Sequence, residues 1–294
     1  MPIDARTRLV LLLGDPVAHS RSPLIHNAAF RHQGVNLVYV AARVAREDLA
    51  AAVAGLRALG AAGANVTIPH KRAVAPMMDT LSPEAEAVGA VNTIVCRGET
   101  GAVRLHGDNT DVAGFLAPLH AFADRLRGAP MTVLGAGGAA RAVVYALLTT
   151  FAPARLTVVA RDPAKAARLA EAFAGHDAGR ALRAVAWAGA GEAVRASRLL
   201  VNATPVGMHP DAARTPWPHA ADFGPGQIVY DLVYNPETTR LLREAAARGA
   251  TPLGGLDMLL GQAAAAYTQW TRRPFPDAVV RAALRTGASS EETV

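Results

Sequence analysis

Short apolar runs alternate with longer stretches of helical hydrophobic period over the first hundred positions. The apolar runs predict strands at Arg8–Leu13, Leu37–Ala41, Ala64–Ile68 and Asn92–Val95. The alanine-rich stretches between them predict helices at Ser22–His32, Arg46–Leu59 and Pro83–Val88. Strands that alternate with helices form βαβ units, so we expect an α/β fold with a mostly parallel sheet.

A second series of the same kind begins at Met131. Its apolar runs predict strands at Met131–Leu134, Leu156–Ala160, Leu199–Asn202 and Ile228–Leu232. Helices are expected from the glycines after the first of these strands to about Thr150, after the second strand through Ala174, and at Met258–Thr271. Two successive series in 294 residues, about twice the length of a typical domain, indicate two α/β domains.

Local signals mark some element ends. Ser22-Pro23 is typical of a helix start, with the serine hydroxyl at the N-cap and proline at the first helical position. The segment that follows Gly287 is polar, and we expect it to be frayed.

Composition excludes several classes of protein. Half of the residues are hydrophobic and the formal charge is +6, but the arginines are scattered among alanines, which argues against nucleic-acid binding. No apolar run approaches the ~18 residues of a membrane span, and Leu9–Leu13 is too short for a signal-peptide core. A single cysteine, Cys96, cannot form an internal disulfide, which predicts a cytoplasmic protein. The spacing of the nine histidines argues against a catalytic metal.

A glycine-rich turn follows the first strand of the second series. It comprises Gly135, Ala136, Gly137, Gly138 and Ala139. Glycines let a backbone approach a pyrophosphate, which then meets the N-terminus of the following helix. Because the turn lies between a predicted strand and a predicted helix, it indicates a Rossmann-type dinucleotide site rather than a turn used only for packing.

The end of the next strand bears on the choice of cofactor. Enzymes that use NAD place an acid there for the ribose 2′-hydroxyl, whereas NADP enzymes place an arginine for the 2′-phosphate. Arg161 and Lys165 supply positive charge here, so NADP is favoured. Asp162 would repel a phosphate, which leaves NAD possible; its alternative role is to cap the helix that follows.

Polar segments follow or touch the predicted strand ends of the first series. They are 14–23, 65–71 and 89–93, with a fourth at 107–111 between the two series. Ligands collect at the carboxyl ends of strands in open α/β sheets. Without further context, Lys71 would be an ordinary exposed lysine and Asp108 a helix cap.

Together these segments resemble the shikimate dehydrogenase family from Leu12 to about Trp270. The resemblance includes the glycine turn, Asn202-Ala-Thr-Pro205, Tyr230-Asp-Leu-Val-Tyr-Asn-Pro236 and Gly255-Leu-Asp-Met-Leu259 followed by Gln262. It implies an NADP-dependent oxidoreductase that reversibly reduces 3-dehydroshikimate to shikimate in aromatic amino-acid (chorismate) biosynthesis. It also implies an N-terminal substrate domain, 1–107 with 255–294, and a Rossmann-type NADP domain, 108–254, with the C-terminal helices returning to the first domain.

The resemblance also assigns site residues. Lys71 and Asp108 would be the catalytic pair, with the lysine either transferring a proton to the new hydroxyl or mainly orienting the substrate. Substrate would be bound by Ser20, Ser22, Thr67, Asn92, Asp108, Tyr234 and Gln262. Cofactor would be bound by the glycine turn, Arg161, Lys165, Leu232 and Gly255.

Two alternatives remain. Family members of the shikimate type usually carry Asn-Arg-Thr or Asn-Arg-Ser where this chain has Ala160-Arg161-Asp162, so a quinate/shikimate dehydrogenase with NAD or dual cofactor use is the runner-up. A catalytically silent sensor on the same fold is disfavoured because Lys71, Asp108 and Gln262 are all present. The expected partners are small molecules, and the sequence leaves monomer and homodimer open.

Overall fold

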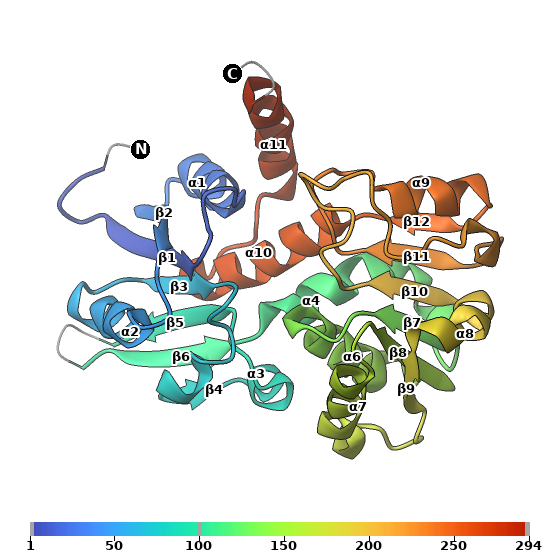
Figure 1. The fold of residues 1–294 in the computed structure, drawn as a ribbon. Helices are drawn as coiled ribbons and strands as arrows, with labels where there is room; N and C mark the ends of the chain where they lie inside the picture. The colour runs from blue at the N-terminus through green and yellow to red at the C-terminus, as the bar shows by residue number, and fades with distance from the viewer. Residues whose placement is uncertain (1–2, 99–101, 292–294) are drawn as a thin grey trace. The chain divides into compact units, whose positions relative to one another are not determined.

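The computed structural model describes residues 3–98 and 102–291. The chain divides into two compact units (Figure 1). Unit 1 comprises Met1–Thr110 with Gln262–Val294, and unit 2 comprises Asp111–Gly261.

The sheet of unit 1 has the strand order β2-β1-β3-β5-β6-β4. Its strands are β1 (Arg8–Gly14), β2 (Leu37–Arg43), β3 (Gly63–Val66), β4 (Thr80–Leu81), β5 (Thr93–Arg97) and β6 (Arg104–Asp108). All neighbouring pairs are parallel except those of β5, which runs antiparallel to both β3 and β6. The expected mostly parallel sheet is therefore present, with one strand reversed.

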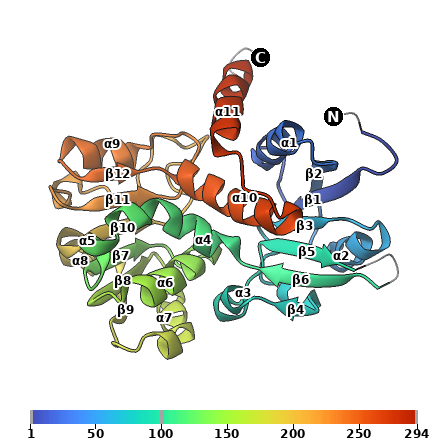
Figure 2. The ribbon, with the colours of Figure 1, turned by 180° about the vertical axis from the view of Figure 1, so that it is seen from behind.

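The helices of unit 1 are α1 (Ser22–His32), α2 (Leu49–Ala58), α3 (Pro83–Val88), the end of α10 (Gly255–Thr271) and α11 (Asp277–Glu291), with a 3₁₀ turn at Ala75–Met77. Helix α1 packs against β2 and α11, as Figure 2 shows from behind. The backbone from 288 to 291, which we expected to be frayed, continues helix α11, whereas 292–294 lie outside the described residues.

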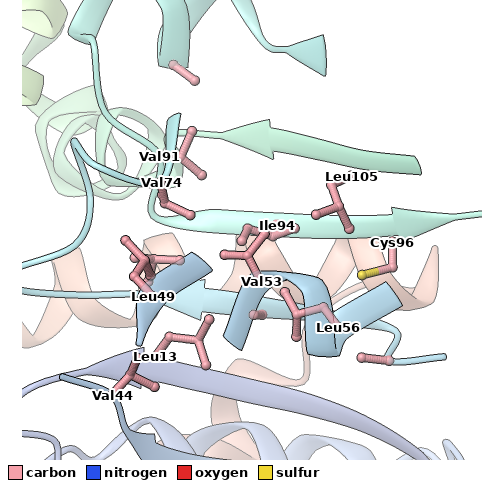
Figure 3. Packing of buried hydrophobic residues seen from close by; sticks show 14 residues of the cluster. Leu13, Val44, Leu49, Val53, Leu56, Val74, Val91, Ile94, Cys96 and Leu105 are labelled. Carbon is pink, nitrogen blue, oxygen red and sulfur yellow. The ribbon is translucent and has the colours of Figure 1, made fainter. Parts of the chain in front are cut away.

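One buried cluster joins α2 to the sheet (Figure 3). Leu13 of β1 and Ile94 of β5 pack with Val53 and Leu56 of α2, and all four side chains are almost completely buried. Burial of a side chain of this size contributes roughly 1.5–3 kcal/mol. Because the cluster draws on β1, β5 and α2, it fixes the strands whose ends carry the polar segments.

The predicted start of helix α1 was wrong in one respect. Ser22 is the first residue of the helix and not its N-cap; Arg21 occupies that position and makes no side-chain cap. The Ser22 amide instead donates to Oγ of Ser20 at 3.2 Å, and its hydroxyl interacts with Tyr39. The serine is drawn inward by this contact and is nearly buried.

Unit 2 is a fully parallel sheet with the order β12-β11-β10-β7-β8-β9. Its strands are β7 (Pro130–Leu134), β8 (Arg155–Ala160), β9 (Leu182–Ala186), β10 (Leu199–Asn202), β11 (Ile228–Asp231) and β12 (Thr251–Leu253). Its helices are α4 (Thr110–Leu116), α5 (Ala123–Leu126), α6 (Gly138–Phe151), α7 (Pro163–Ala172), α8 (Gly191–Ala196), α9 (Arg240–Ala247) and the start of α10. Read from β9, the order is that of a Rossmann sheet, 3-2-1-4-5-6.

The predicted fold class is confirmed: two α/β domains, the second of Rossmann type, with the C-terminal helices grouped with the first. The compact units divide after Thr110 and after Gly261, whereas the sequence placed the boundaries after 107 and after 254. The second division falls inside helix α10, which runs without a break from one unit into the other.

His26 on α1 gives unit 1 a pH-dependent stability. Its ring is completely buried, stacks on Tyr39 at 4.6 Å, and neither ring nitrogen has a hydrogen-bond partner among the described residues. Burial lowers the pKa of His26 from 6.5 to about 3. Between pH 6.5 and about pH 3, His26 is protonated in the unfolded chain and neutral in the folded chain. The free energy of unfolding therefore falls as the pH drops below 6.5.

We therefore predict that His26→Phe flattens the acid side of the stability curve. From pH 7 to pH 4.5 the wild type should lose about 2.5 kcal/mol more unfolding free energy than this variant, measured by urea denaturation. His32→Phe changes an exposed histidine of the same helix and is expected to keep the wild-type slope. Equal slopes for the wild type and His26→Phe would contradict the prediction.

Candidate functional site

The polar segments of unit 1 meet at one edge of its sheet. β1, β3 and β6 end there, and β5 begins there because it runs in the opposite direction. The register pairs Leu13 with Val66, Asn65 with Thr93, and Thr93 with Asp108. Four segments that are far apart in sequence therefore leave the sheet side by side.

Backbone hydrogen bonds tie these segments together beyond the sheet. The Asp15 amide donates to the Ile68 carbonyl at 2.9 Å, which joins the loop after β1 to the loop after β3. The Val91 amide donates to the carbonyl of Lys71 at 2.7 Å, and the Asn92 amide donates to that of Asp108 at 3.0 Å. Lys71, Asn92 and Asp108 therefore stand on neighbouring stretches of backbone.

Gly14 allows the close approach of the first two loops. A Cβ atom at this position would lie 2.3 Å from Cγ2 of Thr67 and 3.0 Å from the Ile68 carbonyl oxygen. A side chain at 14 would push the Thr67 loop away from β1. The glycine thus holds Thr67, a predicted substrate ligand, against the end of β1.

Asn92 is almost completely buried, and its side-chain oxygen is engaged within unit 1. Its Oδ1 accepts from the Thr110 amide at 2.7 Å and from the hydroxyls of Thr110 and Thr93, both at 3.1 Å. The Thr110 amide belongs to the first turn of α4, so Asn92 also anchors the start of that helix.

Asp108 ends β6, with its carboxylate held from several sides. Oδ1 accepts from the Asn109 amide at 2.7 Å and from the Ser82 hydroxyl, and Oδ2 accepts from the Gln269 side-chain amide. The interpretation of Asp108 as a simple cap of the next helix is wrong. The side chain that accepts from the first amide of α4, that of Thr110, is Asn92.

A buried polar layer lies beneath the edge. The Tyr39 hydroxyl donates to Oδ1 of Asn65 at 2.8 Å, and Nδ2 of Asn65 donates to the Asn92 carbonyl and to Oγ1 of Thr93, both at 3.1 Å. Ser22 is joined to this layer through Tyr39. Ser20 lies half-buried on the loop before it.

The remaining predicted substrate ligands come from later in the chain. Gln262 lies half-buried on the part of α10 that belongs to unit 1. Tyr234 lies half-buried on the loop after β11 in unit 2, so its role stays a prediction. The sequence reasoning missed Gln269 and Ser82, which contact Asp108. Gln269 follows Gln262 by two helical turns and so shares its helix face, a signal that was present in the sequence.

In unit 2 the glycine turn lies between β7 and α6, next to the point where the strand order reverses. Gly135 has a φ of 111°, and a Cβ there would lie 3.1 Å from the Ala203 carbonyl oxygen at the end of β10. Positions 137 and 138 differ, because a Cβ there would meet nothing within 4 Å. The turn is thus closely packed at its first glycine and open at its last two.

These features fit a pyrophosphate. Gly137 caps α6 without a side-chain hydrogen bond, and the first turn of this helix contains no acidic residue. Backbone N–H groups at such a terminus attract an anion. The open space at Gly137 and Gly138 gives a dinucleotide room to approach, so the residues present fit the expected cofactor.

The end of β8 presents Arg161 and Lys165, which are both exposed, together with Asp162. Oδ1 of Asp162 accepts from the Ala164 amide at 3.0 Å, so this residue caps α7, the alternative role that the sequence suggested. The capping bond uses one of its oxygens but leaves its charge in place.

The loops after β10 and β11 are fixed by Asp231. This fully buried carboxyl accepts from Nδ2 of Asn202 at 2.8 Å, from the Thr239 hydroxyl at 2.6 Å and from the Val233 amide at 3.1 Å. Burial raises the pKa of Asp231, while the three hydrogen bonds act in the opposite direction. A Cβ at Gly255 would lie 2.3 Å from the Leu232 carbonyl oxygen, so these two predicted cofactor ligands are in close contact.

Between 3 and 98 and between 102 and 291, no three His, Cys, Asp or Glu side chains are grouped so as to hold a metal ion. In the same ranges, no helix combines the length and the apolar character needed to cross a membrane.

Comparison with known proteins gives matches over almost the whole chain. Family models match at residues 12–94, the shikimate dehydrogenase substrate binding domain, and 255–285, the shikimate 5′-dehydrogenase C-terminal domain. A shikimate dehydrogenase (NADP(+)) from Salinibacter ruber is 62% identical over 287 residues, covering 97% of this chain and 99% of that protein.

Two solved structures are similar to this chain over almost its whole length. A shikimate dehydrogenase in complex with NADP+ superposes with a TM-score of 0.89 at 35% identity, covering 97% of both chains. A shikimate 5-dehydrogenase from Thermus thermophilus in complex with NADP(H) and shikimate has a TM-score of 0.82 at 42% identity, covering 95% of this chain and 99% of that one.

Gly135 and Gly138 are expected to respond differently to alanine. Gly135→Ala places a side chain in left-handed backbone and against the end of β10, so it should lower the unfolding free energy of the ligand-free protein by at least about 1 kcal/mol. Gly138→Ala has room and lies in a helix, so it should preserve or raise that free energy. It should nevertheless weaken NADP binding severalfold, because the new methyl group occupies the approach to the backbone. Chemical denaturation and calorimetric titration measure the two effects, and equal stability of the two variants would refute this assignment.

Proposed function

The chain belongs to the shikimate dehydrogenase family, and from this premise we propose that it catalyses the reversible NADPH-dependent reduction of 3-dehydroshikimate to shikimate. The observation that carries the proposal is the convergence of Lys71, Asn92 and Asp108 at one edge of the unit 1 sheet. The 62% identity to the Salinibacter enzyme over nearly the full length supports the substrate and the cofactor. The enzyme thus acts as an oxidoreductase on a CH–OH group of the shikimate pathway.

Unit 1 would bind the substrate. The hydroxyls of Ser20 and Ser22 would donate to its carboxylate, and Tyr234 would lie beside that group. Thr67, Asn92 and Gln262 would hold the ring oxygens. Because Gly14 and the Asn92 contacts hold the loops in place before substrate arrives, little ordering remains to be done on binding.

Lys71 and Asp108 would carry out the proton transfer. When NADPH is bound, its nicotinamide supplies a hydride to the carbonyl carbon. The oxygen gains negative charge at that moment, and the Lys71 ammonium stabilises it and donates the proton that makes the hydroxyl. The Asp108 carboxylate orients a substrate hydroxyl and the ammonium, and its own orientation is fixed by its contacts to Ser82 and Asn109.

Unit 2 would bind NADP. The α6 N-terminus and the open glycines would receive the pyrophosphate, and the Leu232–Gly255 contact would support the nicotinamide end. Arg161 would stack on the adenine and pair with the 2′-phosphate, with Lys165 adding charge one turn later. Asp162 opposes this phosphate, so NAD remains a weaker cofactor.

We also propose that the partners are small molecules and that the compartment is the cytoplasm. The support is chemical: Cys96 is the single cysteine, and burial raises the pKa of its thiol to about 11. A thiol of this kind stays protonated and does not serve as a nucleophile or a disulfide partner.

Replacement of Lys71 tests the reaction. Lys71→Ala should lower kcat for shikimate oxidation by about 10²–10⁴-fold, with a much smaller rise in KM, because it removes the proton donor and not the main substrate contacts. Arg72→Ala, at the exposed neighbouring position, should retain the wild-type kcat. Survival of kcat in Lys71→Ala would exclude the proposed role, and wild-type protein that oxidises quinate faster than shikimate would favour the runner-up activity.

Replacement of Asp162 tests the cofactor assignment. Asp162→Ser keeps a helix cap while removing the charge that opposes the 2′-phosphate. The ratio of kcat/KM for NADP to that for NAD should therefore rise about fivefold to tenfold. Glu171→Gln removes an exposed charge near the other end of α7 and should leave the ratio unchanged. A higher kcat/KM of the wild type for NAD than for NADP would contradict the proposed use of NADP.

A further inference from the structure

Asp231 is a fully buried carboxyl that the proposed function does not use. It ends β11 and lies directly beside Asn202, the last residue of β10, in the register of the two parallel strands. Nδ2 of Asn202 and the Val233 amide donate to its Oδ1 at 2.8 and 3.1 Å, and the Thr239 hydroxyl donates to its Oδ2 at 2.6 Å. Oδ1 therefore faces the loops at the strand ends, and Oδ2 faces the start of α9.

Neighbouring contacts show that all three partners of Asp231 are donors. Oδ1 of Asn202 accepts from the Thr204 amide at 3.0 Å, so the opposite end of this side chain, Nδ2, faces Asp231. The Thr239 hydroxyl accepts from the Leu242 amide as the N-cap of α9, so its hydrogen is directed to Asp231. Because a carboxylate only accepts, three converging donors fit the ionised form of this group.

The orientation of the Asn202 side chain shapes the loop after β10. Its Oδ1 also accepts from the Thr204 hydroxyl at 2.7 Å, and the oxygen of that hydroxyl accepts from the Val206 amide at 3.3 Å. A Cβ at Gly135 would lie 2.9 Å from Cγ2 of Thr204, so this loop packs directly against the glycine turn. Asp231 thus holds the loop after β10 through the amide of Asn202.

The loop after β11 is held by the same carboxylate oxygen. Oδ1 accepts from the Val233 amide, and the carbonyl of Val233 accepts from the Gly255 amide at 3.2 Å. The Leu232 amide donates to the Asn202 carbonyl at 3.0 Å, which joins this loop to the end of β10. Leu232 and Gly255 are both predicted cofactor ligands. A single buried oxygen therefore organises two loops at the carboxyl edge of the unit 2 sheet.

Both loops belong to one half of the Rossmann sheet. A dinucleotide binds across the point where the strand order reverses, with one mononucleotide on each half. The glycine turn follows β7 and Arg161 follows β8, so this half would receive the adenine end of NADP. The half formed by β10, β11 and β12 would then receive the nicotinamide end.

We propose that Asp231 is a positioning residue for the nicotinamide half of NADP: through Asn202 and the Val233 amide it orders the two loops against which that half binds. The inference rests on the proposed function and deepens its cofactor site. Hydrogen bonds to an ionised acceptor are stronger than those between neutral groups. Because they order the loops before the cofactor arrives, less conformational entropy is lost when NADP binds.

The test compares NADP with 2′,5′-ADP, a fragment that carries only the adenine half. Asp231→Ala removes the acceptor of both loops and should raise the Kd for NADP about tenfold, measured by calorimetric titration. The Kd for 2′,5′-ADP should stay within about twofold of the wild type, because this fragment does not reach the two loops. A role in stability alone predicts that both ligands, or neither, lose affinity.

Two further variants separate the loop contacts of Asp231 from its contact with α9. Asp231→Asn keeps one oxygen for the loop amides and should restore the Kd for NADP to within about threefold of the wild type. Thr239→Val is the matched control, since it removes the bond to Oδ2 and the N-cap of α9. It should lower the thermal midpoint and leave the Kd for NADP within about twofold.

If Asp231→Ala does not fold, Asn202→Ala breaks the same link from the side of the loop and should show the same selective loss of NADP affinity. Unchanged NADP binding in the folded variant, or an equal weakening of NADP and 2′,5′-ADP, would overturn this inference alone. An equal loss of NADP affinity in Thr239→Val would also overturn it. A wild type that binds neither ligand would overturn the proposed cofactor and this inference with it.

Discussion

Asn92 joins the strand ends from which the proposed catalytic residues project. Its carbonyl accepts from the Val66 amide at 2.8 Å and from Asn65, its amide donates to the Asp108 carbonyl, and its side-chain oxygen holds the first turn of α4. One buried residue thereby fixes β3, β6 and the backbone at Thr110 with respect to one another within unit 1. Loss of a buried hydrogen-bonding partner costs roughly 1–3 kcal/mol, so displacement of any of these elements is opposed.

The reversed direction of β5 determines which strand ends meet at this edge of the unit 1 sheet. In a purely parallel sheet only carboxyl ends would meet here, but β5 brings its amino end, with Asn92 and Thr93, between the ends of β3 and β6. Buried side chains from both chain directions can then bond one another, as in the Tyr39–Asn65–Thr93 layer. The layer is polar and fully paired, so it holds the loops above it in place at little cost.

In unit 2 the loops at the strand ends are held in place by different kinds of residue. All strands of its sheet are parallel. Gly135 has no side chain that would separate the end of β7 from the end of β10. Gly255 likewise lets the start of α10 approach the loop after β11. Asp231 then ties the loops after β10 and β11 together. The two units therefore position loops at strand ends, one through a buried amide and the other through glycines and a buried carboxyl.

The sequence alone determined the elements whose signals are local. The helices Ser22–His32 and Pro83–Val88 and the strand Leu199–Asn202 have the predicted bounds, because continuous apolar or periodic runs specify them. The glycine turn and the family motifs likewise indicated the fold class and the activity. Strand β6 was missed, since Arg104-Leu-His-Gly-Asp108 has no apolar run and is stabilised by pairing with β5 and β4. Only the tertiary structure decided that Ser22 contacts Tyr39 instead of capping its helix, that Asn92 supports α4, and that Gln269 holds Asp108. These contacts join residues distant in sequence, and their partners are chosen by strand register and helix packing, which no local pattern encodes.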